Sequence, residues 1–139
     1  MKTWKQGFIG VLVIFTLLLT FTACDNGNGK DNDTYYVKYE TSMTSIYIIK
    51  KSYIKISTEN GIKNIETSPA FSETFGPVSK GFLASLETYL DVSSSLVQTS
   101  VTARIYISKN SEPFVLKAFD TSACPMSNNP IKINYKIDF

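Results

Sequence analysis

The sequence has no histidine in its 139 residues and only two cysteines, Cys24 and Cys124. Without histidine there is no Ser-His-Asp triad, no Cys-His pair, no histidine metal ligand and no imidazole that titrates near neutral pH. The sequence also lacks a CxxC pair, a glycine-rich phosphate loop and a nucleophile elbow. We therefore expect no catalytic residues, no metal site and no cofactor, and we predict that the chain is not an enzyme.

An excess of positive charge is also absent from most of the chain. The whole sequence carries 14 Lys+Arg against 12 Asp+Glu. Lys2 and Lys5 account for this entire excess, so the rest of the chain is electrically balanced. Proteins that bind nucleic acid need a basic surface to neutralise phosphates. The balance therefore predicts no nucleic-acid partner.

Residues 1–23 have the composition of a secretory signal peptide. Lys2 and Lys5 precede residues 7–23, an uncharged stretch dominated by Ile, Val, Leu and Phe. A helix of that length is slightly short for a membrane span, since each residue adds about 1.5 Å against about 30 Å of hydrocarbon. The stretch ends in Ala23, and small residues before the cleavage point are typical of signal peptides.

The end of this segment, Phe21-Thr22-Ala23-Cys24, resembles the lipobox of bacterial lipoproteins. The resemblance implies that Cys24 is acylated, as with palmitate, and becomes the first residue of the mature chain. It also implies a place in the bacterial cell envelope, lipid-anchored to a membrane and facing the periplasm or the cell surface. Two alternatives are an ordinary secretory signal and an uncleaved anchor, and in both Cys24 has no role.

Residues 25–34 form a polar run of Gly, Asn, Asp, Lys and Thr without an apolar side chain. Such a segment cannot bury surface, so we expect a flexible tether. Ten residues of this kind span about 16–19 Å on average. The acidic residues of the run lack the spacing and the final Glu of an EF-hand. We interpret residues 24–34 as the lipidated cysteine and its tether.

Residues 35–139 alternate apolar and polar side chains, which indicates β-strands. In residues 101–107, Val101, Ala103, Ile105 and Ile107 share one face. Turn residues separate the runs, as at Asn60-Gly61. Strands are expected at residues 35–40, 53–58, 62–67, 71–75, 101–107, 114–119 and 131–138, with a further one at 45–49. This spacing predicts an all-β domain, an antiparallel β-sandwich of seven or eight strands.

Residues 80–90 fit two interpretations. The apolar residues Phe82, Leu83, Leu86, Tyr89 and Leu90 follow the spacing of a helix. If the segment is a strand, alternate residues from Phe82 to Leu86 share one face instead. Periodicity alone leaves helix and strand open.

Five short motifs, at residues 36–40, 71–75, 80–86, 101–107 and 121–123, resemble small exported proteins of the MmpS type. These are membrane-anchored proteins that accompany large mycobacterial lipid transporters, with lipoprotein relatives in other bacteria. The resemblance implies an immunoglobulin-like β-sandwich, and it makes residues 81–88 a strand. It implies no catalysis, and in the mycobacterial branch of the family it implies an accessory role to a transporter of the resistance-nodulation-division class.

The candidate binding residues are four tyrosines that alternation places on outward strand faces: Tyr36, Tyr53, Tyr89 and Tyr106. Outward tyrosines can stack on a sugar or a small ligand, but tyrosine is also a common cross-strand partner in sheets. The scattered carboxylates are interpreted as solvated charges: Glu66, Glu73, Glu87, Asp91, Glu112 and Asp120.

Together these patterns predict a non-catalytic envelope lipoprotein whose sandwich binds a protein partner or an envelope component. The transporter that the MmpS-type resemblance implies is one such protein partner. The alternative is a lipoprotein that binds a glycan or a small ligand through its outward tyrosines.

Overall fold

Eight β-strands make up the regular structure of the computed structural model, which describes residues 32–45, 51–68, 70–91 and 99–139. In chain order they are β1 (Tyr35–Ser45), β2 (Ser52–Thr58), β3 (Gly61–Thr67), β4 (Phe71–Val78), β5 (Leu83–Leu90), β6 (Thr99–Lys109), β7 (Val115–Ala123) and β8 (Ile131–Lys136). The expected signal peptide, Cys24 and most of the expected tether lie outside the described residues. No helix in the described residues is long and apolar enough to cross a membrane.

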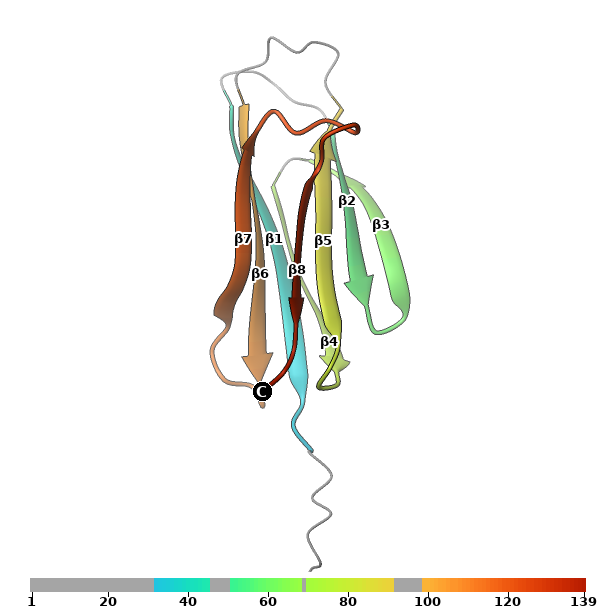
Figure 1. Ribbon diagram of the computed structural model, residues 1–139, viewed down its shortest axis with the longest axis vertical. Helices are drawn as coiled ribbons and strands as arrows, with labels where there is room; N and C mark the ends of the chain where they lie inside the picture. Colours follow the sequence, from blue (N-terminus) through green and yellow to red (C-terminus); the bar gives the residue numbers. More distant parts are fainter. Residues whose placement is uncertain (1–31, 46–50, 69, 92–98) are drawn as a thin grey trace, which may run out of the picture. The chain divides into compact units, whose positions relative to one another are not determined.

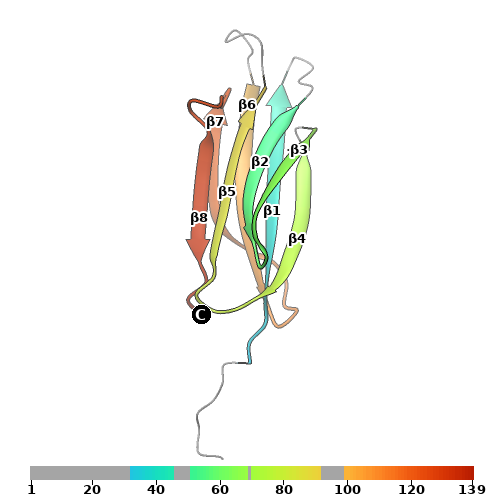
Figure 2. The ribbon, with the colours of Figure 1, turned by 90° about the vertical axis from the view of Figure 1, so that its right-hand side faces the viewer.

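The strands form two four-stranded sheets that pack face to face (Figure 1 and Figure 2). Sheet A has the order β4-β1-β6-β7, and sheet B has the order β3-β2-β5-β8. Every pair of neighbouring strands is antiparallel. The antiparallel β-sandwich expected from the sequence is therefore confirmed, with eight strands.

The core follows the alternation of the sequence. On β6 the four expected inward residues are all buried: Val101, Ala103, Ile105 and Ile107. The facing layer from sheet B contains Ile54, Ile56, Ala84, Leu86 and Ile131. Burying a side chain of this size contributes about 1.5–3 kcal/mol. The buried residues of the two sheets together form one hydrophobic core.

Two buried tyrosines on β1 also join this core. Tyr39 of sheet A donates its hydroxyl to the backbone carbonyl of Ser57 in sheet B, at 2.7 Å. Burial raises the pKa of Tyr39, while the hydrogen bond with Ser57 lowers it. Tyr35 donates its hydroxyl to the carbonyl of Phe139. Because both hydroxyls have partners inside the domain, these two residues belong to the packing and not to a surface site.

Residues 83–90 form a strand, not a helix. On β5 the residues Ala84, Leu86, Thr88 and Leu90 are buried, whereas Leu83 is 54 % exposed. The apolar residues have the spacing of a helix, but the segment is a strand because β5 lies inside sheet B, hydrogen-bonded to β2 and β8. Of the further strand expected at residues 45–49, Ser45 is the last residue of β1, and residues 46–49 lie outside the described residues.

The two ends of the sandwich carry different connections (Figure 1). We call the end where β1 starts the proximal end; the β2–β3, β4–β5 and β6–β7 connections lie there. The backbone of Gly81 donates to Ile137 at this end, at 2.7 Å. The other end is the distal end, where Leu90 donates to Pro125 at 2.9 Å and Cys124 donates to Thr99 at 2.8 Å.

Candidate functional site

The four outward tyrosines are divided between the two outer faces of the sandwich. Tyr53 and Tyr89 lie on sheet B, near its distal end. Tyr36 and Tyr106 lie on sheet A, where the Lys38 ammonium is 4.9 Å from the centre of the Tyr106 ring. All four are half-buried. Half-burial agrees with the prediction that the four tyrosines face outward. Because they lie on the outer faces of two different sheets, they do not form one surface.

Tyr53 and Tyr89 form a stacked pair. They are direct partners in the β2–β5 register, and such side chains stand about 4.5–5.5 Å apart at Cβ. Their ring centres are 5.1 Å apart and their planes differ by 17°. Each ring therefore covers one face of the other, and both tyrosines line the hollows beside the pair.

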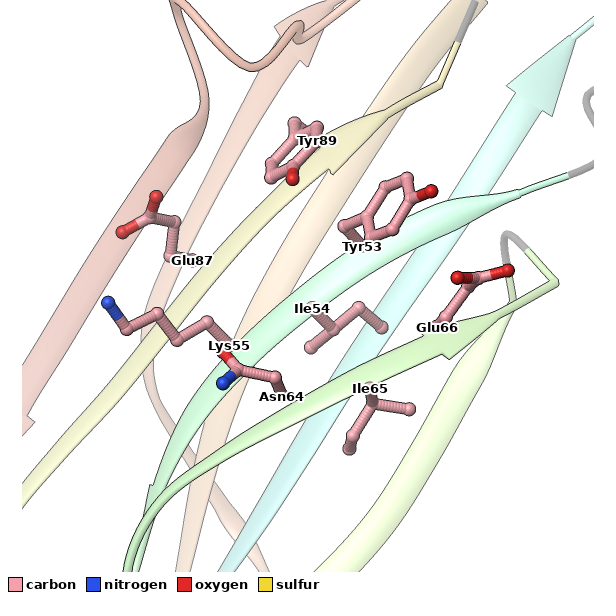
Figure 3. Close-up of a pocket in the computed structure, with 8 residues that line it drawn as sticks. All are labelled: Tyr53, Ile54, Lys55, Asn64, Ile65, Glu66, Glu87 and Tyr89. Atoms are coloured by element: carbon pink, nitrogen blue, oxygen red, sulfur yellow. The ribbon is translucent and has the colours of Figure 1, made fainter.

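A hollow of about 460 Å³ lies against this pair (Figure 3). The two tyrosines and Ile65 contribute ring and aliphatic carbon, and the rim carries Lys55, Asn64, Glu66 and Glu87. Ligand sites commonly measure about 300–1,000 Å³, so the hollow is large enough for a small molecule or a sugar ring. Hydrogen-bond donors and acceptors therefore surround an aromatic surface.

A second hollow, of about 620 Å³, shares the same two tyrosines. Its other residues are Leu90 and Asp91 at the end of β5, and Met126, Ser127 and Asn128 in the β7–β8 connection. The stacked pair is thus common to two adjoining hollows. A chain-like ligand that crossed the pair could occupy both.

Two of the acidic side chains that line the first hollow are paired with lysines, and Lys55 and Asp91 add one charge of each sign. Glu66 forms an ion pair with Lys51, and this hydrogen bond raises the pKa of the Lys51 ammonium. Glu87 forms an ion pair with Lys132 at 3.3 Å. A nearly neutral site of this kind suits an uncharged, hydroxyl-rich ligand better than a strongly charged one.

The carboxylates interpreted as solvated charges do not form one cluster. Glu66 and Glu87 line the first hollow, and Asp91 lines the second. Glu73 pairs with Lys63 at 3.4 Å, and Asp120 accepts a hydrogen bond from the backbone of Thr121 at 2.8 Å. In the described part of the chain, no three acidic or cysteine side chains are grouped closely enough to hold a metal ion.

Sequence patterns did not reveal the exposed apolar residues of the sandwich. The large ones are Ile62, Leu83, Phe114, Val115, Leu116 and Phe119. Four of them lie on or just before β7, an edge strand of sheet A. On the outer face of that sheet, Leu116 is the partner of Tyr106 and Phe119 is the partner of Arg104. Alternation could not identify this surface, because it does not tell which strand lies at an edge.

No protein-family model, curated protein or solved structure matches this chain. The resemblance to MmpS-type proteins therefore stays a prediction from sequence motifs. A function must therefore be inferred from the fold and from the geometry of the surfaces.

Proposed function

We propose that the chain is a non-catalytic lipoprotein of the bacterial envelope, anchored through Cys24, whose β-sandwich binds a glycan. The observation that supports a glycan as the ligand is the stacked Tyr53–Tyr89 pair between two hollows with polar rims. A sugar ring has apolar C–H faces and hydroxyl edges. The aromatic rings that line the hollow suit the former, while Lys55, Asn64 and Glu87 suit the latter.

The tyrosine pair gives this proposal a direct test. Tyr53→Ala and Tyr89→Ala should each weaken binding of a glycan found by array screening about tenfold or more, because about 1.4 kcal/mol of lost stacking is a factor of ten. Calorimetric titration of the purified mature protein measures the change. Tyr36→Ala is the matched control, since it removes a half-buried tyrosine from the opposite sheet.

The tyrosine variants also need a fold control, because the Tyr53–Tyr89 pair contributes to pairing of β2 with β5. Circular dichroism and thermal unfolding should show that each variant remains folded at the titration temperature. Binding that is equal in wild type, Tyr53→Ala and Tyr89→Ala would rule out the tyrosine site. The absence of any glycan that binds would rule out the ligand class.

A protein partner, such as a transporter, is the second candidate, and a separate surface favours it. Phe119 is 66 % exposed beside Arg104, and Leu116 is 43 % exposed beside Tyr106. Aromatic residues and arginine are enriched among the side chains that dominate protein interfaces. The outer face of β6 and β7 therefore has the composition of a protein-docking surface.

The partner would contact the face of β7 and not extend its edge. Lys117 is an extra residue in the β6–β7 register, and this bulge disrupts the ladder that an added strand would follow. The Lys117 ammonium lies 4.2 Å from the centre of the Phe139 ring, at the same edge. Asp120 also accepts the backbone N–H of Thr121. These features protect the edge from strand addition.

Crosslinking in intact envelopes tests this second candidate. Phe119→Ser should abolish a specific crosslinked species, because it removes the most exposed aromatic side chain of the surface. Ile62→Ser is the control, since it removes an exposed apolar residue from sheet B. If both variants keep the same crosslinked species, or if wild type yields none, the β6–β7 face is not the docking surface.

A further inference from the structure

We propose that the proximal end of the sandwich rests on the lipid bilayer that holds the acyl chains of Cys24, with apolar side chains in its interface. This inference rests on the proposed lipid anchor. It adds a second contact with the membrane, made by the folded domain, and it fixes which end of the sandwich faces away from the bilayer.

The first observation is the distribution of exposed apolar side chains. Among the described residues six large ones are exposed, and five of these lie at or near the proximal end: Ile62, Leu83, Phe114, Val115 and Leu116. They belong to three different connections or strand ends, so local sequence does not explain the grouping. Ile62 lies on the edge strand β3 and residues 114–116 lie at the edge strand β7, so the five side chains are spread across the proximal end. Exposed apolar side chains that share one end of a domain indicate an interaction surface.

The second observation is where the incoming chain is held. Thr34 and Asn110 are joined by two hydrogen bonds: Thr34 N–H donates to the Asn110 side chain at 2.9 Å, and Asn110 N–H donates to the Thr34 carbonyl at 2.8 Å. Asp33 accepts a hydrogen bond from Asn110 at 2.6 Å and pairs with Lys109 at 2.5 Å. The chain from Cys24 therefore joins the domain at the β6–β7 connection, which also carries Phe114.

The length of the intervening segment completes the argument. Residues 25–34 span about 16–19 Å on average if they are flexible. The headgroup region on each side of a bilayer is only about 5–8 Å thick. A lipid on Cys24 therefore keeps the β6–β7 connection within reach of the interface, and at high local concentration. The apolar side chains at that end can then leave the water and enter the interface of the bilayer.

The charges at the proximal end decide what kind of contact this is. Its charged side chains are Lys63, Lys80, Lys109, Lys117 and Lys136, with Asp33, Glu59, Glu112 and Asp138. Basic clusters attract anionic lipids, but here acidic side chains balance the lysines. The contact is therefore apolar, and it needs neither anionic lipid nor low salt.

The same geometry directs the candidate glycan site away from the membrane. Tyr53 and Tyr89 lie near the distal end. β6 runs from one end to the other with 11 residues, or roughly 35 Å at about 3.3 Å per residue. A domain that rests on its proximal end presents the two hollows to the medium.

Fluorescence quenching in vesicles tests the contact on the full, lipidated protein. Trp4 is the only tryptophan, and it leaves with the signal peptide, so Phe114→Trp introduces a single reporter into the mature chain. In phosphatidylcholine vesicles whose acyl chains are brominated near the headgroup, its emission should fall at least twofold relative to plain vesicles. Asn128→Trp, exposed at the distal end, is the matched reporter and should not be quenched.

A second change asks whether the neighbouring apolar residues maintain the contact. Leu83→Glu in the Phe114→Trp background should remove most of the quenching, whereas Phe119→Glu should remove little. Quenching should be unchanged in high salt and with added anionic lipid. Absence of quenching in vesicle-bound Phe114→Trp, or equal quenching of both reporters, would overturn the inference and leave the anchor intact. Failure of the protein to float with vesicles would instead overturn the anchor, and the inference with it.

Discussion

Cys24→Ala should abolish incorporation of a labelled fatty acid into this protein, whereas Cys124→Ala should leave it unchanged. The resemblance of residues 21–24 to a lipobox predicts acylation at Cys24, and the chain has only these two cysteines. Cys124 lies after β7, is partly exposed and forms no disulfide. It is therefore the matched control for a thiol that does not receive lipid.

The measurement combines labelling with intact mass. Wild type and Cys124→Ala should show a mature chain that begins at an acylated Cys24, and Cys24→Ala should keep residues 1–23. Because that segment is apolar, the unprocessed variant can still pellet with membranes, so fractionation alone does not decide the question. Label retained by Cys24→Ala, or a wild-type N-terminus other than a modified Cys24, would contradict the lipoprotein prediction. The mass of an acyl-modified N-terminal fragment would then identify the true anchor.

Anchoring by Cys24 and contact by the proximal end have different strengths. Each buried CH₂ of an acyl chain contributes about 0.8 kcal/mol, and two or more chains make anchoring durable. Phe114, Val115 and Leu116 offer far less apolar surface, and each is already half in contact with the domain. If Cys24 is lipidated as proposed, we expect the lipid to determine whether the protein is on the membrane and the proximal end to determine how it is oriented there.

The sequence predicts strands well where alternation is uninterrupted. β6 and β8 each have an inward apolar residue at alternate positions of the predicted run. Val101, Ala103, Ile105 and Ile107 of β6 are buried, as are Ile131 and Ile133 of β8, while Tyr135 is half-buried. A strand with one buried face requires this period, because successive side chains point to opposite faces. For these two strands the period of the amino-acid sequence is enough to assign the buried face.

β5 could not be assigned in the same way. Its apolar residues satisfy the helical and the strand period at once, and the choice depends on β2 and β8, which are distant in sequence. Leu83 shows the consequence, since it fits a buried helical stripe but is exposed as the first residue of the strand. Hydrogen bonds with segments that are distant in sequence therefore decide that β5 is a strand and not a helix.

The candidate site was predicted only in part, for a related reason. Alternation indicated that Tyr53 and Tyr89 face outward, but it could not assign Tyr36 and Tyr106 to the other sheet. Pairing of two tyrosines depends on the register of β2 with β5, and register is a tertiary property. The exposed residues of β7 were missed because the position of a strand in its sheet is also tertiary.

The largest effect on folding should come from the middle of β6. Ile105→Ala should lower the free energy of unfolding by about 2–5 kcal/mol, because it leaves a cavity where a fully buried side chain packed. Ile105 lies between Tyr39 of β1 and Ala118 of β7 in sheet A. Neither neighbour can move into the space without breaking its own strand pairing, so the cavity should remain largely open.

Ile62→Ala is the matched control for this prediction. It deletes the same atoms from a side chain that is 57 % exposed on the edge strand β3. Away from buried features such changes usually alter stability by about 0.5 kcal/mol or less. Urea unfolding of the mature chain, followed by circular dichroism, gives both values with the same reference state. Similar losses for the two variants, or a loss near zero for Ile105→Ala, would show that the inner face of β6 has been assigned incorrectly. A loss of several kcal/mol confined to Ile105→Ala would show that the stability of the sandwich, and with it the register that aligns Tyr53 with Tyr89, depends on this interior.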